Sequence, residues 1–213
     1  EDSKENNTIK NIIFDLGNVI INYSQDKIIN NFTKKEDEIT YIYDEIFNSP
    51  EWALMDLGKI TIDETISTIN KRNNFKYDTL TKNFLYEWYK TQPINRDIVS
   101  IAQQLKNNGY NLFVLSNMAN PTYKFFKNDE FFKLCTGIVI SAQEHVKKPN
   151  LQIYQILLDR YNLKAEECLF IDDDDSGKNY EAANSIGING RRVQPNDASD
   201  IKKLLHEYKI KSF

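Results

Sequence analysis

The sequence predicts an α/β fold in which a doubly wound parallel sheet carries an inserted helical unit. In the second half of the chain, short apolar runs bounded by turn residues alternate with segments of helical periodicity. Such alternation is typical of strand–helix–strand units and a parallel sheet. One further apolar run, residues 12–14, stands near the N-terminus and is separated from the others by a long stretch with helical patterning alone.

The first apolar run ends directly in an acidic residue. Ile12 to Phe14 lead into Asp15, and Gly17 follows in a turn. A run of this kind reads as a buried strand, and in an open α/β sheet ligands bind beyond the carboxyl ends of the strands. Taken alone, Asp15 could equally well cap the turn that follows, as aspartates often do.

Residues 22–93 predict a unit built from helices. Ser24 can cap a first helix, and apolar residues recur at helical spacing up to Trp88. Thr61 and Glu64 have the spacing of a capping box. Pro93 marks the exit from this unit.

The remainder of the chain alternates between strands and helices. The predicted strands cover residues 112–115, 137–140, 168–171 and a short segment near Arg192-Val193. The predicted helices cover residues 98–105 (ended by Gly109), a short helix through Phe125-Phe126 after a turn at Asn120-Pro121, a helix capped by Asn150, residues 179–186 (ended by Gly187) and residues 201–208.

Composition limits the possible partners. The chain has 213 residues, enough for one large domain or for a core with a smaller insertion. A net charge of −4 gives no reason to expect a nucleic acid or an anionic membrane as partner. No apolar run approaches the length of a membrane span, and residues 1–7 are polar and acidic, unlike a signal peptide. We therefore expect a cytoplasmic protein whose residues 1–7 form a disordered tail.

The cysteines and histidines suggest no metal site. Cys135 and Cys168 lie among apolar residues, so we expect buried, reduced thiols. The chain has no CxxC motif and no Cys/His cluster, which argues against structural zinc. His206 is expected at the surface, and His145 stands near the rim of the predicted sheet.

Polar residues follow other predicted strands in the same way as Asp15 follows the first. Ser116-Asn117 come after residues 112–115, and Asp172-Asp173 come after residues 168–171. Lys148 stands just before a predicted helix. A carboxylate, a hydroxyl, an ammonium and an acidic pair at the ends of elements would form one site if the strands lie side by side.

Four segments, in this order, resemble the motifs of the haloacid dehalogenase (HAD) superfamily. They are Asp15-Leu16-Gly17-Asn18-Val19, Ser116-Asn117, Lys148-Pro149, and Phe170-Ile171-Asp172-Asp173 followed by Asn179. The resemblance extends from about Ile9 to near the end of the chain. It implies a Rossmann-like core, residues 8–21 and 94–213, and a helical cap of the C1 type, residues 22–93.

The resemblance also implies roles for individual residues. Asp15 would be the nucleophile and would bind metal together with the Gly17 carbonyl, Asp172 and Asp173. Ser116 and Asn117 would bind a phosphoryl group, and Lys148 would neutralise it and act in catalysis. These roles describe a Mg²⁺-dependent hydrolase of a small phosphorylated metabolite, working through an aspartyl-phosphate. A sugar phosphate is one candidate, because a branch similar to sugar-phosphate phosphatases also has Gly two residues after the nucleophile.

Two departures from the HAD pattern bear on these roles. Related phosphatases carry a second Asp, an acid and base, where this chain has Gly17. Water or another side chain, such as His145, would then have to protonate the leaving group. The acidic run Asp172 to Asp175 is also longer than a pair. We favour Asp172-Asp173 over Asp174-Asp175 as metal ligands, because they directly follow the strand.

Other functions fit parts of the pattern. A phosphate- and Mg²⁺-binding module without turnover would explain Gly17. A 2-haloacid dehalogenase would not need the acidic pair, and a phosphomutase would need the acid that Gly17 lacks. Residues 172–177 resemble the start of a calcium loop, but Ala183 stands where that loop needs Glu. The cap's aromatic residues are expected to form bundle core: Tyr41, Tyr43, Trp52, Trp88 and Tyr89. The sequence indicates no oligomeric state.

Overall fold

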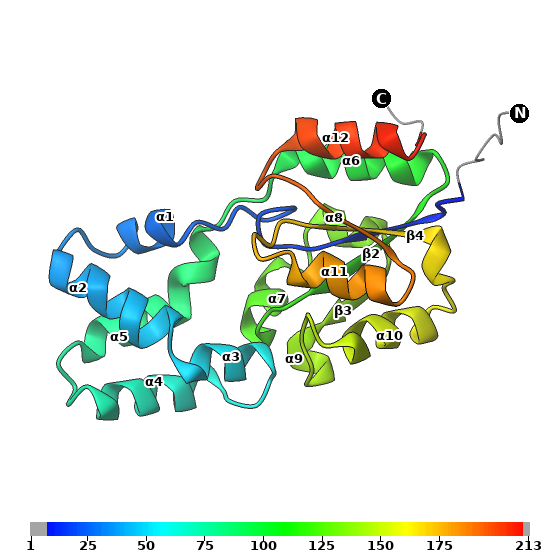
Figure 1. The fold of residues 1–213 in the computed structure, drawn as a ribbon. Coiled ribbons are helices and arrows are strands. Elements are labelled where there is room, and N and C mark those ends of the chain that lie inside the picture. The colour runs from blue at the N-terminus through cyan, green and yellow to red at the C-terminus, as the bar shows by residue number, and fades with distance from the viewer. Residues whose placement is uncertain (1–7, 211–213) are drawn as a thin grey trace, which may run out of the picture.

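A five-stranded parallel sheet forms the centre of the protein (Figure 1). The computed structural model describes residues 8–210, so the disordered tail predicted at residues 1–7 lies outside the described residues. The strands are β1 (Asn11–Phe14), β2 (Asn111–Ser116), β3 (Cys135–Ile140), β4 (Cys168–Asp172) and β5 (Asn189–Arg192). Their order in the sheet is β3-β2-β1-β4-β5. The predicted α/β class is confirmed.

The strand order places β1 at the switch point of the sheet. From β1 the chain builds β2 and β3 on one side and then crosses to β4 and β5 on the other. All four pairings are parallel. The carboxyl ends of β1, β2 and β4 therefore lie next to one another, at the point where ligands bind in doubly wound sheets.

Alternating side chains of each strand enter two separate cores. Ile12 and Phe14 pack with one layer of helices, whereas Ile13 packs with the other. The first layer contains α6 (Arg96–Asn107), α8 (Glu130–Leu134) and α12 (Ala198–Glu207). The second contains α10 (Leu151–Arg160) and α11 (Lys178–Ser185). In Figure 1, α6 and α12 lie side by side above the sheet. Because both faces are covered, the three central strands β1, β2 and β4 consist of almost continuous apolar residues, whereas the edge strand β5 is polar.

Three further short elements lie in the connections between the strands and the longer helices of this layered unit. They are α7 (Asn120–Phe126), α9 (Ser141–Glu144) and the 3₁₀ turn η3 (Ala165–Glu167). The prediction included α7 but not α9 or η3, because elements of three or four residues are too short to show a period. The longer helices occur where they were predicted, and Asn150 caps α10 by accepting from the Gln152 N–H at 2.9 Å.

The segment between β1 and α6 is helical, as predicted. It contains α1 (Gln25–Asn30), α2 (Glu36–Tyr41), a π-type turn η1 (Ile42–Phe47), α3 (Pro50–Asp56), α4 (Ile62–Arg72), α5 (Asp78–Glu87) and a 3₁₀ turn η2 (Trp88–Thr91). These helices form a lobe to one side of the sheet in Figure 1. Their side chains make a third apolar core, with fully buried Ile28, Ile42 and Phe84.

Local signals in this lobe act as predicted. Ser24 accepts a hydrogen bond from the Lys27 N–H at 3.4 Å. Thr61 accepts from the Glu64 N–H at 3.1 Å, and its hydroxyl donates to the Glu64 carboxylate. These contacts satisfy N–H groups that a helix start leaves without a partner.

Two connections join the lobe to the layered unit. The Asn22 N–H donates to the Pro93 carbonyl at 2.9 Å, and the Asn95 N–H donates to the Ile20 carbonyl at 2.8 Å. The chain segment that enters the lobe, residues 20–22, thus pairs with the segment that leaves it, residues 93–95. The assignment of residues 22–93 as a cap domain stays a prediction.

Neither cysteine forms a disulfide. Cys168 is fully buried, as predicted, but Cys135 is only half-buried. Burial raises the pKa of Cys135 to about 12 and that of Cys168 to about 11, so both stay protonated thiols at neutral pH. None of the helices in residues 8–210 combines the length and the apolar character that crossing a bilayer requires.

Gly190 allows helix α11 to approach strand β5. A Cβ atom at this position would overlap the backbone carbonyl oxygen of Tyr180, which cannot move aside alone. We expect Gly190→Ala to lower the free energy of unfolding by about 1–3 kcal/mol, measured by urea denaturation. Gly17→Ala is the control, since its Cβ would meet only the Tyr23 Cβ at 4.0 Å. Equal effects of the two substitutions would contradict this explanation.

Candidate active site

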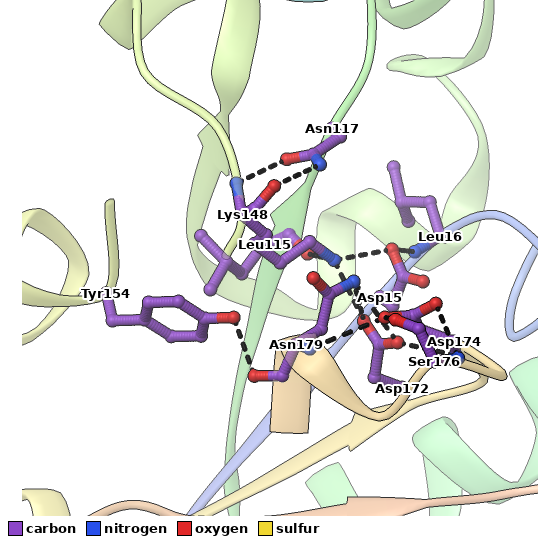
Figure 2. Close-up of polar contacts among 10 residues, drawn as sticks. All are labelled: Asp15, Leu16, Leu115, Asn117, Lys148, Tyr154, Asp172, Asp174, Ser176 and Asn179. Atoms are coloured by element: carbon purple, nitrogen blue, oxygen red, sulfur yellow. Dashed lines mark hydrogen bonds and ion pairs between the residues drawn. The ribbon is translucent and has the colours of Figure 1, made fainter. Parts of the chain in front are cut away.

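The ends of two neighbouring strands bring Asp15 and Asp172 together. Phe14 of β1 pairs with Ile171 of β4, and the Asp15 N–H donates to the Ile171 carbonyl at 3.0 Å. Asp15 follows β1 directly, and Asp172 is the last residue of β4. Because the strands run parallel and in this register, both carboxylates emerge at the same edge of the sheet (Figure 2).

Asp173 completes a cluster of three carboxylates. One oxygen from each of Asp15, Asp172 and Asp173 lies within 4.8 Å of the others. Asp172 is fully buried and Asp15 nearly so. Three acidic groups held this close repel one another, so the cluster requires positive charge nearby.

Lys148 supplies one such charge. Its ammonium donates to Asp15 Oδ1 at 2.9 Å, to Asp172 Oδ2 at 3.0 Å and to the Leu115 carbonyl at 3.0 Å. The residue is only 3% exposed. All three ammonium protons therefore have partners, and the side chain is fixed in one position.

Asn117 holds the backbone of Lys148 in place. The Lys148 N–H donates to Asn117 Oδ1 at 2.8 Å, and Asn117 Nδ2 donates to the Lys148 carbonyl at 3.0 Å. This pair of bonds fixes the loop before α10 to the end of β2 (Figure 2). Ser116, predicted with Asn117 as a phosphate-binding residue, is the buried last residue of β2.

Burial and mutual charge perturb the acidity of this cluster. Burial raises the pKa of Asp15 well above its usual value, against the opposing charge of Lys148. Burial and then the charge of Asp172 raise the pKa of Asp173 to about 6. Burial alone would lower the pKa of Lys148, but Asp15 and Asp172 outweigh it and the pKa is raised. Lys148 is therefore a fixed cation.

The donor set fits a divalent cation with a preference for oxygen. Three carboxylates face one ammonium, which leaves excess negative charge, and Mg²⁺ is bound by carboxylates and carbonyls. Gly17 also lines the adjacent cavity. Its local β-bridge uses the Leu16 carbonyl and the Asn18 N–H, so the bridge does not use the Gly17 carbonyl.

The four consecutive aspartates 172–175 fall into two groups, and only the first two face the carboxylate cluster. Asp174 accepts from the Ser176 N–H at 3.2 Å and from its hydroxyl at 2.7 Å, and so organises the turn before α11. Asp175 is exposed and pairs with Arg192. Of the four carboxylates, the structure brings Asp172 and Asp173 to Asp15 and directs the other two elsewhere.

Two further residues belong to the site: Asn179, which stands in the fourth HAD-like motif but had been given no role, and Tyr154, which the sequence interpretation had not considered. Asn179, at the start of α11, donates to both oxygens of Asp172 at 3.3–3.4 Å. Tyr154 of α10 donates its hydroxyl proton to the Asn179 carbonyl at 2.7 Å. Figure 2 shows this chain of contacts reaching from Tyr154 to the carboxylates. The position of Asn179 at a helix start after the acidic loop was the available signal.

A cavity of about 260 Å³ lies between the carboxylate cluster and the helical lobe. Polar groups form one end of it, and apolar and aromatic groups form the rest. The polar or titratable lining residues are Asp15, Tyr23, Asp56, Tyr89, Asn117, Thr122, Lys148 and Asn179. The larger apolar ones are Trp52, Met55, Ile62, Leu85, Trp88 and Met118. The ion pair of Lys148 thus leaves room for a ligand beside Asp15.

The aromatic residues of the lobe serve two purposes. Tyr41 and Tyr43 pack in the helical core, as expected. Trp52 and Trp88 also pack against that core, with ring centroids 5.2 Å apart, but they line the cavity as well. Helical periodicity cannot separate these groups, because core residues and residues at the rim of a cavity share one face of a helix.

His145 lies outside the cavity lining. The residue is exposed, and its Nδ1–H donates to the Leu57 carbonyl at 2.9 Å. His206 is also exposed, as predicted. His145 thus contacts the helical lobe instead of facing Asp15.

Comparisons with known proteins identify the family of this chain. A family model described as haloacid dehalogenase-like hydrolase matches residues 9–187. A sesquiterpene phosphatase of Aspergillus oryzae, AstK, is 26% identical over 184 residues, covering 86% of this chain and 89% of that protein.

Solved structures share the fold. A HAD family enzyme of Bacteroides thetaiotaomicron, solved as a magnesium complex, has a TM-score of 0.74 at 22% identity, covering 93% of this chain and 98% of that one. An L-2-haloacid dehalogenase of Xanthobacter autotrophicus has a TM-score of 0.63 at 14% identity, covering 95% and 84%. Since the family model matches well over half of the sequence, this protein belongs to the haloacid dehalogenase-like hydrolase family.

Proposed function

We propose that the protein is a Mg²⁺-dependent phosphomonoester hydrolase that uses Asp15 as its nucleophile. The observation that carries this proposal is the buried group of Asp15, Asp172, Asp173 and Lys148 at the polar end of the cavity. Hydrolysis of a phosphate ester brings one anion toward another, so it needs positioning and positive charge. The site offers a carboxylate nucleophile beside a fixed ammonium.

Each residue of the cluster has a distinct part in this proposal. Asp15 Oδ1 accepts from the Leu16 N–H at 2.8 Å and from Lys148, which fixes the carboxylate for attack on phosphorus. Attack forms an aspartyl-phosphate, which water then hydrolyses. Lys148 and the Asn117 region bind the phosphoryl oxygens. Mg²⁺ held by Asp15, Asp172, Asp173 and the Gly17 carbonyl would screen the carboxylates from the phosphate.

The helices of residues 22–93 act as a cap in this proposal. They supply one wall of the cavity, and the β-sheet unit supplies the other. A cap over the site excludes water and selects the substrate. The paired connections at Asn22 and Asn95 are where movement of this unit would be absorbed.

The wall of the cavity favours a substrate with an apolar alcohol group. Trp52, Trp88, Tyr89 and Met55 offer few hydrogen-bond partners for the hydroxyls of a sugar. A prenyl or aryl phosphate would instead bury its apolar surface against these rings. The similarity to a sesquiterpene phosphatase supports the same class. We therefore favour a phosphorylated apolar alcohol over the sugar phosphate expected from the sequence.

Two other functions are less well supported. A dehalogenase needs no metal, and three converging carboxylates would cost free energy without serving it. A binding module without turnover is consistent with Gly17. The following experiment separates this module from an enzyme.

We expect the wild-type protein to release phosphate from 4-nitrophenyl phosphate only when Mg²⁺ is present. EDTA should abolish release, and added Mg²⁺ should restore it. Asp15→Asn should lower kcat at least about 10³-fold, because the amide cannot attack phosphorus. Phosphate binding without turnover by the wild-type protein would instead indicate the binding module.

Metal binding tests which of the four aspartates 172–175 bind Mg²⁺. Asp173→Asn should raise the Mg²⁺ concentration needed for half-maximal turnover, on the order of 10–100-fold, because a ligand is lost. Asp175→Asn, an exposed carboxylate paired with Arg192, should leave that concentration unchanged. The reverse result would assign the metal to Asp174-Asp175.

Selectivity tests the apolar wall. Trp88→Ala should lower kcat/KM for a sesquiterpene-sized prenyl monophosphate about 10–200-fold. It should change kcat/KM for a hexose phosphate much less. Phe125→Ala is the control, because Phe125 is exposed and contacts the Tyr89 ring from outside the cavity lining. A hexose phosphate turned over faster than the prenyl phosphate by the wild-type protein would contradict the proposed class.

A further inference from the structure

Cleavage of an alkyl phosphate needs a proton donor that Gly17 cannot provide. When the P–O bond breaks, the leaving oxygen gains an electron pair, and an alkoxide is a poor leaving group unless it is protonated. The donor must face the cavity between Asp15 and the helical lobe. The titratable side chains that line this cavity are Asp15, Tyr23, Asp56, Tyr89 and Lys148.

Four of these five groups are unsuited to donate a proton. Asp15 is the nucleophile, and Lys148 is held as a cation by two carboxylates. Burial raises the pKa of Tyr23 to about 12 and raises that of Tyr89 as well. His145 is outside the cavity and donates to Leu57.

Asp56 differs from the others in being available. It is the last residue of α3 and is half-buried in the cavity wall. Burial raises the pKa of its carboxyl group to about 6, although Lys147 opposes the shift. Within residues 8–210, no hydrogen bond or salt bridge holds the carboxyl group of Asp56. A carboxylic acid with this pKa can donate and regain a proton near neutral pH.

The backbone around Asp56 is fixed to the sheet unit at three consecutive residues. The Ser141 hydroxyl donates to the Asp56 carbonyl, and it also accepts from the Met118 N–H at 2.9 Å. His145 donates to the Leu57 carbonyl. Gly58 has a φ of +66°, and a Cβ atom there would overlap the Ala142 carbonyl oxygen. Helix α9 thus holds the end of α3 over the site.

We propose that Asp56 is the general acid and base of the reaction, in the place of the side chain that Gly17 lacks. This inference rests on the proposed function. It follows from Asp56 and Asp15 lining the same cavity and from the fixed backbone at the end of α3.

Asp56 donates a proton in the first half-reaction and takes one back in the second. In the first, the Asp15 O–P bond forms, the P–O bond of the ester breaks, and the leaving oxygen takes the Asp56 proton. In the second, the Asp56 carboxylate takes a proton from water as that water attacks phosphorus. The Asp15 O–P bond then breaks, orthophosphate leaves, and both carboxyl groups return to their starting states.

Dependence on the leaving group tests this role. Asp56→Asn should lower kcat/KM for an alkyl phosphate about 10²–10⁴-fold. It should affect 4-nitrophenyl phosphate far less, because nitrophenolate leaves without a proton. Asp44→Asn, an exposed aspartate in the same lobe, is the matched control and should change neither rate. Equal losses on both substrates would mean a structural role for Asp56 and would overturn the proposal.

The pH profile and a rescue give independent readouts. The charged or titratable groups near Asp56 include Tyr23, Lys147, His145 at the neighbouring Leu57 carbonyl and, on the same cavity, Asp15, Tyr89 and Lys148. The ratio of alkyl to aryl kcat/KM should fall as pH rises through the pKa of Asp56, since an acid must be protonated to act. In Asp56→Asn the ratio should not vary with pH. A ratio that titrates equally in wild type and variant would contradict the proposal.

Gly17→Asp provides the rescue, because position 17 has room for a side chain. In the Asp56→Asn background it should restore alkyl phosphate turnover. Failure of the proposed function would appear differently, as a wild-type protein without Mg²⁺-dependent release from the aryl phosphate.

Discussion

The contact on which the site depends is the Lys148 ammonium shared between Asp15 and Asp172. Both carboxylates and the ammonium are almost fully removed from water. Burying ions is costly, and one cation does not neutralise three carboxylates. A fold selected for stability alone would gain by replacing these groups with apolar residues. Their presence at a strand end, beside a cavity, is a cost that only a ligand or a reaction explains.

Parallel pairing makes this contact possible. Asp15, Asn117, Lys148 and Asp172 come from four places in the sequence, yet β1 lies between β2 and β4. Packing on both faces fixes the register, because a slip by one residue would send each side chain to the opposite core, where the space is shaped for a different residue. The same register places Asp15 beside Asp172. The hydrophobic cores above and below the sheet thus determine the geometry of the polar site.

Sequence patterns predicted the sheet unit better than the helical lobe. Apolar runs and the acidic residues that end them predicted β1, β4, Asp15 and the Asp172-Asp173 pair, because these signals are local. The fourth motif includes Asn179, but the sequence alone could not give its contact with Asp172, since this contact depends on how α11 packs. Nor could it separate Trp52 and Trp88 from core residues. Asp56 was also missed, because its contacts are with α9, far away in sequence.

The two units divide the chemistry between them. In the proposed reaction the sheet unit would hold the phosphate end through Asp15 and Lys148, whereas α3 contributes Asp56 and part of the cavity wall. Because Ser141 and His145 bind the end of α3, any movement that separates α3 from α9 also removes Asp56 from the cavity. The acid would then be present only while the cavity is closed to water. In the proposed mechanism, this arrangement would protect the aspartyl-phosphate and link proton transfer to substrate enclosure.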